Sequence, residues 1–201
     1  MGLLKSIGGS GGVTAYDISA YRKIGTAEYE AWYTSQKTGS TSSQSLAITA
    51  NYIFAMPFLV SKAITLDRIA INVVTQAAGL IRLGIYANDS SKGLYPGALL
   101  LDAGEVNTGS SGTKSITINQ ALTPGLYWLA SNSNATPIVK WHNGGTVLPL
   151  LGTDNTLSGG SYIGLSKSSA FGPFPSTYPS AAILLPAGVH GPIIVFVRLS
   201  A

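Results

Sequence analysis

The sequence predicts an all-β protein, an antiparallel β-sandwich or jelly roll of about eight or nine strands preceded by an extended N-terminal arm. Apolar and polar residues alternate in several short runs, Gly- and Pro-rich turn signals separate these runs, and helical periodicity is almost absent. The 201 residues are 45% hydrophobic, which is enough for a core, but only 10% charged. Because the chain has 24 Ser and 17 Thr, hydroxyl groups replace many of the usual surface charges.

Residues 1–45 form the predicted arm, and residues 46–201 form the predicted sandwich. The arm opens with a linker-like glycine-rich run at 8–12, and 17–33 is the stretch that best fits a helix. A polar tract over 38–45 then indicates a loop. We expect the arm to dock onto other proteins through its scattered apolar and aromatic side chains, Leu3, Leu4, Tyr16, Tyr21 and Trp32.

The first long strand is predicted over residues 64–74, where the apolar pattern changes parity. Ile64 and Leu66 share one phase, whereas the apolar residues from Ile69 onward share the other. Since successive side chains of a strand point to opposite faces, a regular strand would expose one of these sets. A bulge or bend at 67–68 would keep both sets on the core.

Later strands alternate without such a break, over 81–86, 115–118, 126–130 and 193–199. In the third of these, Trp128 has the same phase as Leu126, which predicts a core position for this tryptophan. Turn signals lie between the runs, at 95–97, 108–112, 123–125 and 143–145.

Several classes of function have little support in the composition. The net charge is +4, but the basic residues are scattered, whereas a nucleic-acid surface needs them clustered. The chain has no Cys, which excludes disulfides, thiolate zinc sites and cysteine nucleophiles. Its longest apolar run, 53–60, contains Pro57 and is far shorter than a membrane-spanning helix. We therefore expect no nucleic-acid partner, no membrane span, and no metal or cofactor.

The sequence also predicts a protein that is not an enzyme. Asp102 and Glu105 are close enough in sequence for a hydrolytic carboxylate pair, but they lie beside a turn. Solvated loop acids, or a structural Ca²⁺ site, are alternative interpretations. His142 and His190 are the only histidines, and no nucleophile elbow or phosphate-binding loop accompanies them.

Aromatic side chains in polar connections are the remaining lead. Flat aromatic faces on the loops of a β-sandwich can stack on sugar rings. The alternative is that these side chains cap the ends of the sandwich or fill a subunit interface. The candidates for stacking on a glycan are Trp141, His142, Tyr162 and Tyr178; Phe171 and Phe174 lie in similar connections.

Two stretches resemble a module of tailed-bacteriophage structural proteins, Leu94–Val106 (LYPGALLLDAGEV) and Leu122–Ala130 (LTPGLYWLA). The module is a jelly-roll or carbohydrate-binding-like sandwich found on tail fibres, tail tips and capsid-surface proteins. The resemblance implies a structural protein of the virion, made in the host cytoplasm and displayed on the particle surface. It further implies a homo-oligomer, preferably a trimer, that is attached to other virion proteins by its arm and contacts neighbouring subunits or a host surface glycan. The alternative is a stand-alone carbohydrate-binding module without catalytic activity.

Overall fold

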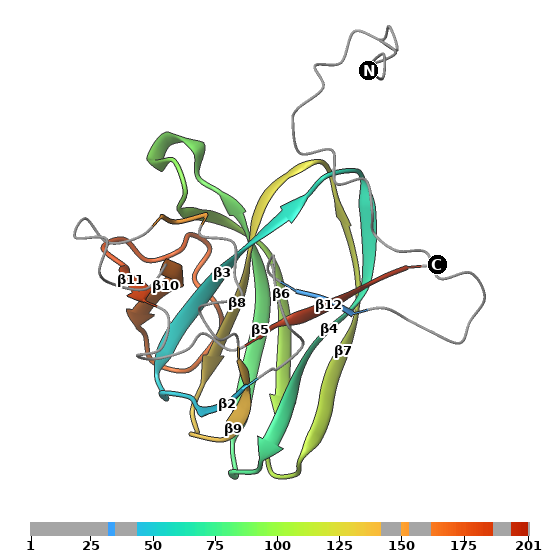
Figure 1. The fold of residues 1–201 in the computed structure, drawn as a ribbon, viewed down its shortest axis with the longest axis vertical. Helices are drawn as coiled ribbons and strands as arrows, with labels where there is room; N and C mark the ends of the chain where they lie inside the picture. The colour runs from blue at the N-terminus through green and yellow to red at the C-terminus, as the bar shows by residue number, and fades with distance from the viewer. Residues whose placement is uncertain (1–31, 35–43, 142–149, 153–161, 187–193, 201) are drawn as a thin grey trace, which may run out of the picture.

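The computed structural model describes residues 32–34, 44–141, 150–152, 162–186 and 194–200, and every structural statement below concerns these residues. They form two antiparallel sheets that face each other as a sandwich (Figure 1). The predicted all-β class is confirmed. The described residues contain twelve strands and no α-helix, so strands exceed the predicted eight or nine; several of the additional ones have four residues or fewer. Of the stretch that fitted a helix, Trp32–Tyr33 is described, and it forms strand β1.

The first sheet is built around the long strand β4. Strand β7 pairs with one side of β4, while β12 and β9 pair with different halves of its other side. Strand β1 extends the sheet beyond β12, and β2 extends it beyond β9. The strands are β1 (Trp32–Tyr33), β2 (Gln44–Ala47), β4 (Ile64–Thr75), β7 (Gly112–Leu122), β9 (Ile138–Trp141) and β12 (Phe196–Leu199).

The second sheet has the order β11-β10-β3-β8-β5-β6, which places β11 and β6 at its edges. The 3₁₀ turn η1 (Ser90–Lys92) connects β5 to β6. The predicted turns at 108–112 and 123–125 carry the chain from β6 to β7 and from β7 to β8, and each connection changes sheet. The strands are β3 (Tyr52–Val60), β5 (Leu80–Asn88), β6 (Pro96–Asn107), β8 (Gly125–Ser133), β10 (Tyr162–Ser168) and β11 (Ile183–Pro186).

The predicted bulge in β4 is confirmed. In the pairing with β12, Leu66 lies opposite Leu199 and Arg68 opposite Arg198, so Asp67 is the extra residue of β4. Ile64 and Leu66 before Asp67, and Ile69 after it, are all buried in the core between the two sheets. The bulge therefore turns both phases of the apolar pattern onto the same face.

A second core lies on the opposite face of the second sheet. Residues 169–182, which we call the cover segment, connect β10 to β11 and pack over this face (Figure 1). Trp128 is fully buried, as predicted, but in this second core rather than between the sheets. Tyr86 is buried beside it, although its neighbour Ile85 belongs to the first core. The second sheet is thus covered on both faces.

Backbone hydrogen bonds fix the cover segment to β6. Leu99 N donates to Ser176 O at 2.8 Å, and Tyr178 N donates to Gly97 O at 2.9 Å. Such bonds allow an irregular chain to be buried, because its peptide groups find partners. Gly84 on β5 makes the close approach possible, since a Cβ there would lie 2.7 Å from the Phe174 ring.

Part of the predicted arm belongs to the sandwich. Strand β1 pairs with β12, and β2 already begins at Gln44, so both precede or cross the expected boundary at residue 46. Residues 1–31 and 35–43 lie outside the described residues.

Candidate functional site

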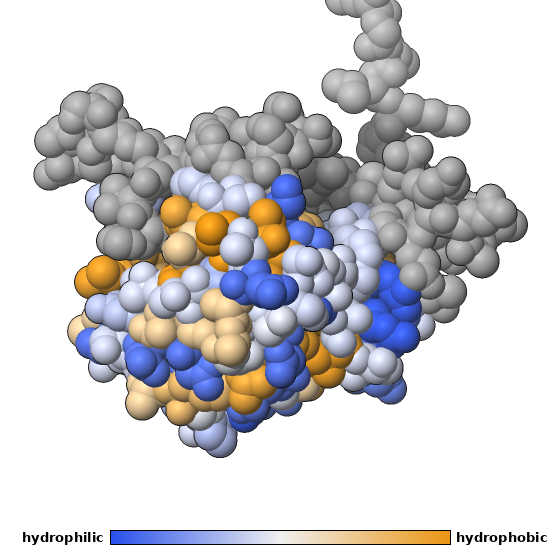
Figure 2. All heavy atoms as spheres, turned by 90° about the horizontal axis from the view of Figure 1, so that it is seen from below, coloured by the Kyte–Doolittle hydropathy of each residue, from blue (hydrophilic) through white to orange (hydrophobic). Residues whose placement is uncertain are grey.

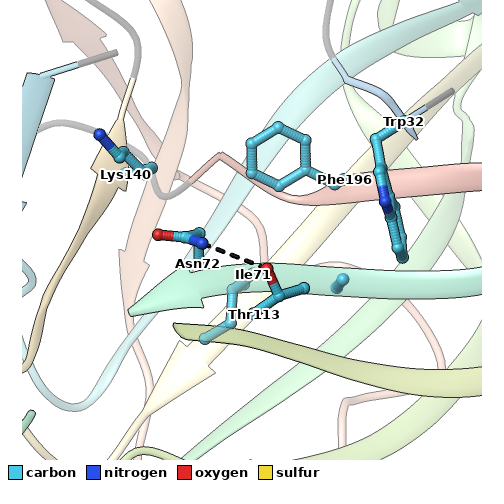
Figure 3. A pocket seen from close by; sticks show the side chains of 7 residues that line it. Trp32, Ile71, Asn72, Thr113, Lys140 and Phe196 are labelled. Carbon is cyan, nitrogen blue, oxygen red and sulfur yellow. Dashed lines mark hydrogen bonds between the residues drawn. The ribbon is translucent and has the colours of Figure 1, made fainter. Parts of the chain in front are cut away.

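The outer face of the first sheet contains a pocket of about 220 Å³ (Figure 3). It forms where β9 and β12 approach the same side of β4 at different points along it. Ile194 N, just before β12, donates to Lys140 O of β9 at 3.1 Å and joins the two strands there. Seven residues from five strands line the pocket: Trp32, Ala70, Ile71, Asn72, Thr113, Lys140 and Phe196.

The pocket combines aromatic walls with polar groups. Trp32 from β1 is 37% exposed, and Phe196 from β12 is half-buried. Asn72 Nδ2 donates to Thr113 Oγ1 at 3.2 Å. No hydrogen bond to the carbonyl oxygen of Asn72 occurs within the described ranges, so this acceptor remains available to a ligand.

Lys140 gives the pocket a positive charge. Within the described part of the chain, its ammonium group forms no ion pair. The other nearby cation, Arg198, lies with its guanidinium carbon 5.9 Å from the centre of the Trp32 ring. Arg198 also binds both carboxylate oxygens of Asp67, the bulge residue of β4. Since that pair is neutral, Lys140 supplies the net charge at the pocket.

The prediction that Asp102 and Glu105 are loop acids is wrong, because both lie on strand β6. Asp102 is half-buried and Glu105 is exposed, and both bind the Arg82 guanidinium on the neighbouring strand β5. Burial lowers the pKa of Arg82, but its hydrogen bonds to the two carboxylates outweigh this effect and raise it. Asp102 also accepts from Phe174 N at 3.1 Å, so it ties β5, β6 and the cover segment together.

Every carboxylate in the described ranges is bound to a cation. Besides the two that bind Arg82, Asp67 pairs with Arg198, and Asp89 pairs with Lys92. The same ranges hold no group of three or more His, Asp or Glu side chains that could bind a metal ion. These acids therefore serve as structural anchors for strands and for η1.

The four predicted glycan-stacking residues do not come together. Tyr178 is 2% exposed, in the second core, and its ring meets those of Tyr86 and Tyr95 edge to face. Trp141 is 6% exposed at the end of β9 in the first sheet. Because both side chains are buried, neither ring has a free face for a sugar. The prediction failed because it inferred exposure from the polar residues that surround these aromatics in the sequence. Tyr162 is half-buried at the start of β10, and His142 lies outside the described residues.

Among the predicted docking residues, only Trp32 is described. Leu3, Leu4, Tyr16 and Tyr21 lie outside the described residues. Trp32 belongs to the first sheet and forms one wall of the pocket. Sequence reasoning missed Asn72 and Lys140. For Asn72 a signal exists, because it is the one polar residue in the run Ile69–Val74.

A second surface feature is the apolar edge of the second sheet. Strand β11 is the outermost strand, and its residues Ile183 and Leu184 are 62% and 42% exposed. Figure 2 shows another face of the molecule, where apolar patches interrupt a surface made mostly of weakly polar residues. Within the described ranges, no helix has the length and apolarity needed to cross a membrane.

Comparisons with protein-family models, curated proteins and solved structures found no match to this chain. Its function is therefore argued from its own residues.

Proposed function

We propose that this protein is a non-catalytic structural protein of a tailed-bacteriophage virion, a component of the tail fibre, tail tip or head surface. Its N-terminal residues attach it to other virion proteins, and its sandwich projects to contact neighbouring subunits or a host surface glycan. The protein acts as a homo-oligomer, preferably a trimer.

The observation that carries this proposal is the exposed apolar edge at β11. Monomeric proteins protect their edge strands with charges, prolines or bulges, since a free edge pairs with other chains. Ile183 and Leu184 instead present large apolar side chains to solvent, with Pro186 only at the end of the strand. In a symmetric oligomer such an edge is buried against the next subunit.

The opposite edge of the sheet provides a contrast. Strand β6 shifts register against β5 at three points, which makes it an irregular template for pairing.

The resemblance to phage structural proteins falls mainly on the second sheet, because residues 94–106 overlap β6 and residues 122–130 run into β8. The carboxylates of the described ranges support a structural role, because each of them is ion-paired with a cation of the same chain.

A stand-alone carbohydrate-binding module remains the second candidate, and the pocket on the first sheet favours it. The two candidates differ in self-association. A virion subunit is an oligomer without sugar, whereas an isolated binding module is a monomer.

Sedimentation velocity of the full chain tests this difference. We expect the wild-type chain to be an oligomer and the double variant Ile183→Lys/Leu184→Lys to be a folded monomer, because charges at the edge oppose pairing. Leu100→Lys is the matched control, since Leu100 is 41% exposed on β6, the strand at the opposite edge of the same sheet. Far-UV circular dichroism checks that each variant is folded.

A monomeric wild-type chain would overturn the proposal in favour of the binding module. If the double variant still forms the oligomer, β11 is not the contact between subunits, and the argument from the exposed edge is refuted. Antibodies against the full chain should in addition label the surface of the phage particles that encode it, and unlabelled particles would contradict the virion assignment.

A further inference from the structure

We propose that the pocket between β1, β12, β4 and β9 binds a sugar ring that bears a carboxylate, as a unit of an anionic surface polysaccharide. This inference rests on the host-contact part of the proposed function and names the class of ligand.

The walls of the pocket fit one sugar ring. A pyranose has an apolar face of C–H groups, which packs against aromatic rings. Trp32 and Phe196 supply two rings from adjacent strands (Figure 3), and Ala70, which lies opposite Phe196 on β4, adds only a methyl group. Pockets for drug-sized ligands measure about 300–1,000 Å³. The smaller volume of about 220 Å³ matches a single ring.

The polar groups of the pocket fit the substituents of such a ring. Asn72 carries an acceptor without a partner in the described ranges, and it can accept a hydrogen bond from a sugar hydroxyl. Lys140 places an ammonium group at the same pocket, and among the described residues this group has no ion-pair partner and no carboxylate lines the pocket. A carboxylate on the ligand would form a charge-assisted hydrogen bond with Lys140, which is roughly twice as strong as a neutral one.

A row of small polar side chains continues from the pocket along β7. Its exposed positions alternate with inward-facing ones, as the period of a strand requires. Thr113 lies opposite Asn72, and Ser115 lies opposite Ala70. Thr117 and Asn119 extend the row away from the pocket. Hydroxyl and amide groups in such a row suit the neighbouring sugars of a polysaccharide chain, which favours a polymer over a free monosaccharide.

Isothermal titration calorimetry of the full chain tests the inference with two acidic probes and their neutral counterparts. The acidic probes are 3′-sialyllactose and trigalacturonate, and the neutral ones are lactose and the fully methyl-esterified trigalacturonate. We expect at least one acidic probe to bind about tenfold more tightly than its neutral counterpart, since an added charged hydrogen bond contributes on this order. Added salt should weaken the acidic probe only.

Two variants separate the contributions to binding. Lys140→Gln removes the charge but keeps a flexible polar side chain, and it should remove the roughly tenfold preference for the acidic probe. Trp32→Ala should weaken both probes of a pair about equally, because stacking does not depend on charge. Lys92→Gln is the matched control, because Lys92 pairs with Asp89 beside the other sheet, and it should leave binding unchanged.

Three results would overturn the inference. In the first, neither acidic probe binds. In the second, neutral and acidic probes bind equally well. In the third, Trp32→Ala dissociates the oligomer and leaves binding intact, which would make the pocket a contact between copies of the chain. An oligomeric chain that binds no acidic probe would refute this inference alone, whereas a monomeric chain that binds one would refute the virion assignment alone.

Discussion

Replacing Tyr178 by Ala tests whether the cover segment is a structural layer of the protein. Tyr178 is 2% exposed, and its ring lies 5.3 Å from that of Tyr86 and 6.0 Å from that of Tyr95. Its hydroxyl group donates to Ile53 O at 3.1 Å. Truncating a buried aromatic residue to Ala costs about 3–5 kcal/mol, a range that already includes the lost contacts and the cavity. We therefore expect Tyr178→Ala to lower the free energy of unfolding by about 4 kcal/mol.

Chemical denaturation and thermal melting measure this loss. In a protein of this length, 1 kcal/mol corresponds to about 2–4 °C, so the melting temperature should fall by about 8–16 °C. Limited proteolysis should cut the variant within residues 169–182, because β6 then holds this segment less firmly. Tyr178→Phe is the control: it keeps the ring, loses one hydrogen bond, and should cost about 1 kcal/mol.

The reasoning would be refuted if Tyr178→Ala melted like the wild-type chain. Normal stability combined with a loss of glycan binding would restore the original prediction that Tyr178 stacks on a sugar.

Three further predictions concern the same layer. Gly84→Ala should cost about 1–3 kcal/mol by denaturation, because its Cβ would lie within 2.7 Å of the Phe174 ring; Gly172→Ala, with no atom within 4 Å, should be neutral. Burial raises the pKa of Tyr178 above its usual value of 10, so the unfolded chain loses this proton first as the pH rises. Stability should therefore fall above pH 10, and in denaturation measured across pH 9–12 Tyr178→Phe should reduce the slope by about 1.4 kcal/mol per pH unit above about pH 11, with little effect at pH 9. Asp102→Ala should cost about 2 kcal/mol in the same assay, because its removal leaves a partly buried guanidinium with only one acidic partner; an unchanged midpoint would contradict this role.

The strands and the bulge of β4 could be predicted because a buried face imposes a period of two. The parity of Ile64 and Leu66 differs from that of Ile69, and no regular strand can bury all three. A bulge or bend resolves this conflict, so the pattern located the irregularity at residues 67–68, and the pairing with β12 identifies Asp67 as the extra residue. The same logic placed Trp128 in a core, although it could not distinguish which of the two cores.

The cover segment could not be predicted from its composition. Its Gly, Pro and Ser residues are typical of an exposed loop, and a loop can be buried only if its backbone groups find partners. Those partners, such as Leu99 N and Gly97 O, belong to a strand about 80 residues earlier in the chain. A signal was nevertheless present in β5, where both Ile85 and Tyr86 are apolar, since a strand covered on both faces loses its alternation.

The pairing of Asp102 and Glu105 with one arginine depends on a local irregularity. Residues three apart point to opposite faces of a regular strand, so both acids should not reach the same guanidinium. The register between β5 and β6 shifts between Leu83 and Gly84, and Gly104 adopts a positive φ of 94°. The extra residue brings both carboxylates to Arg82, and glycine tolerates the backbone conformation that this requires.

The two sheets divide the available surface in a way that separates assembly from binding. The cover segment closes the outer face of the second sheet, so this sheet can contact other chains only through its edges. No described segment covers the outer face of the first sheet around the pocket, and Trp32 and the polar row of β7 are exposed on it. Because this face points away from the second sheet, a subunit seam along β11 would leave the pocket accessible. Substitutions at Ile183 and at Lys140 should therefore act independently, the first on self-association and the second on ligand affinity.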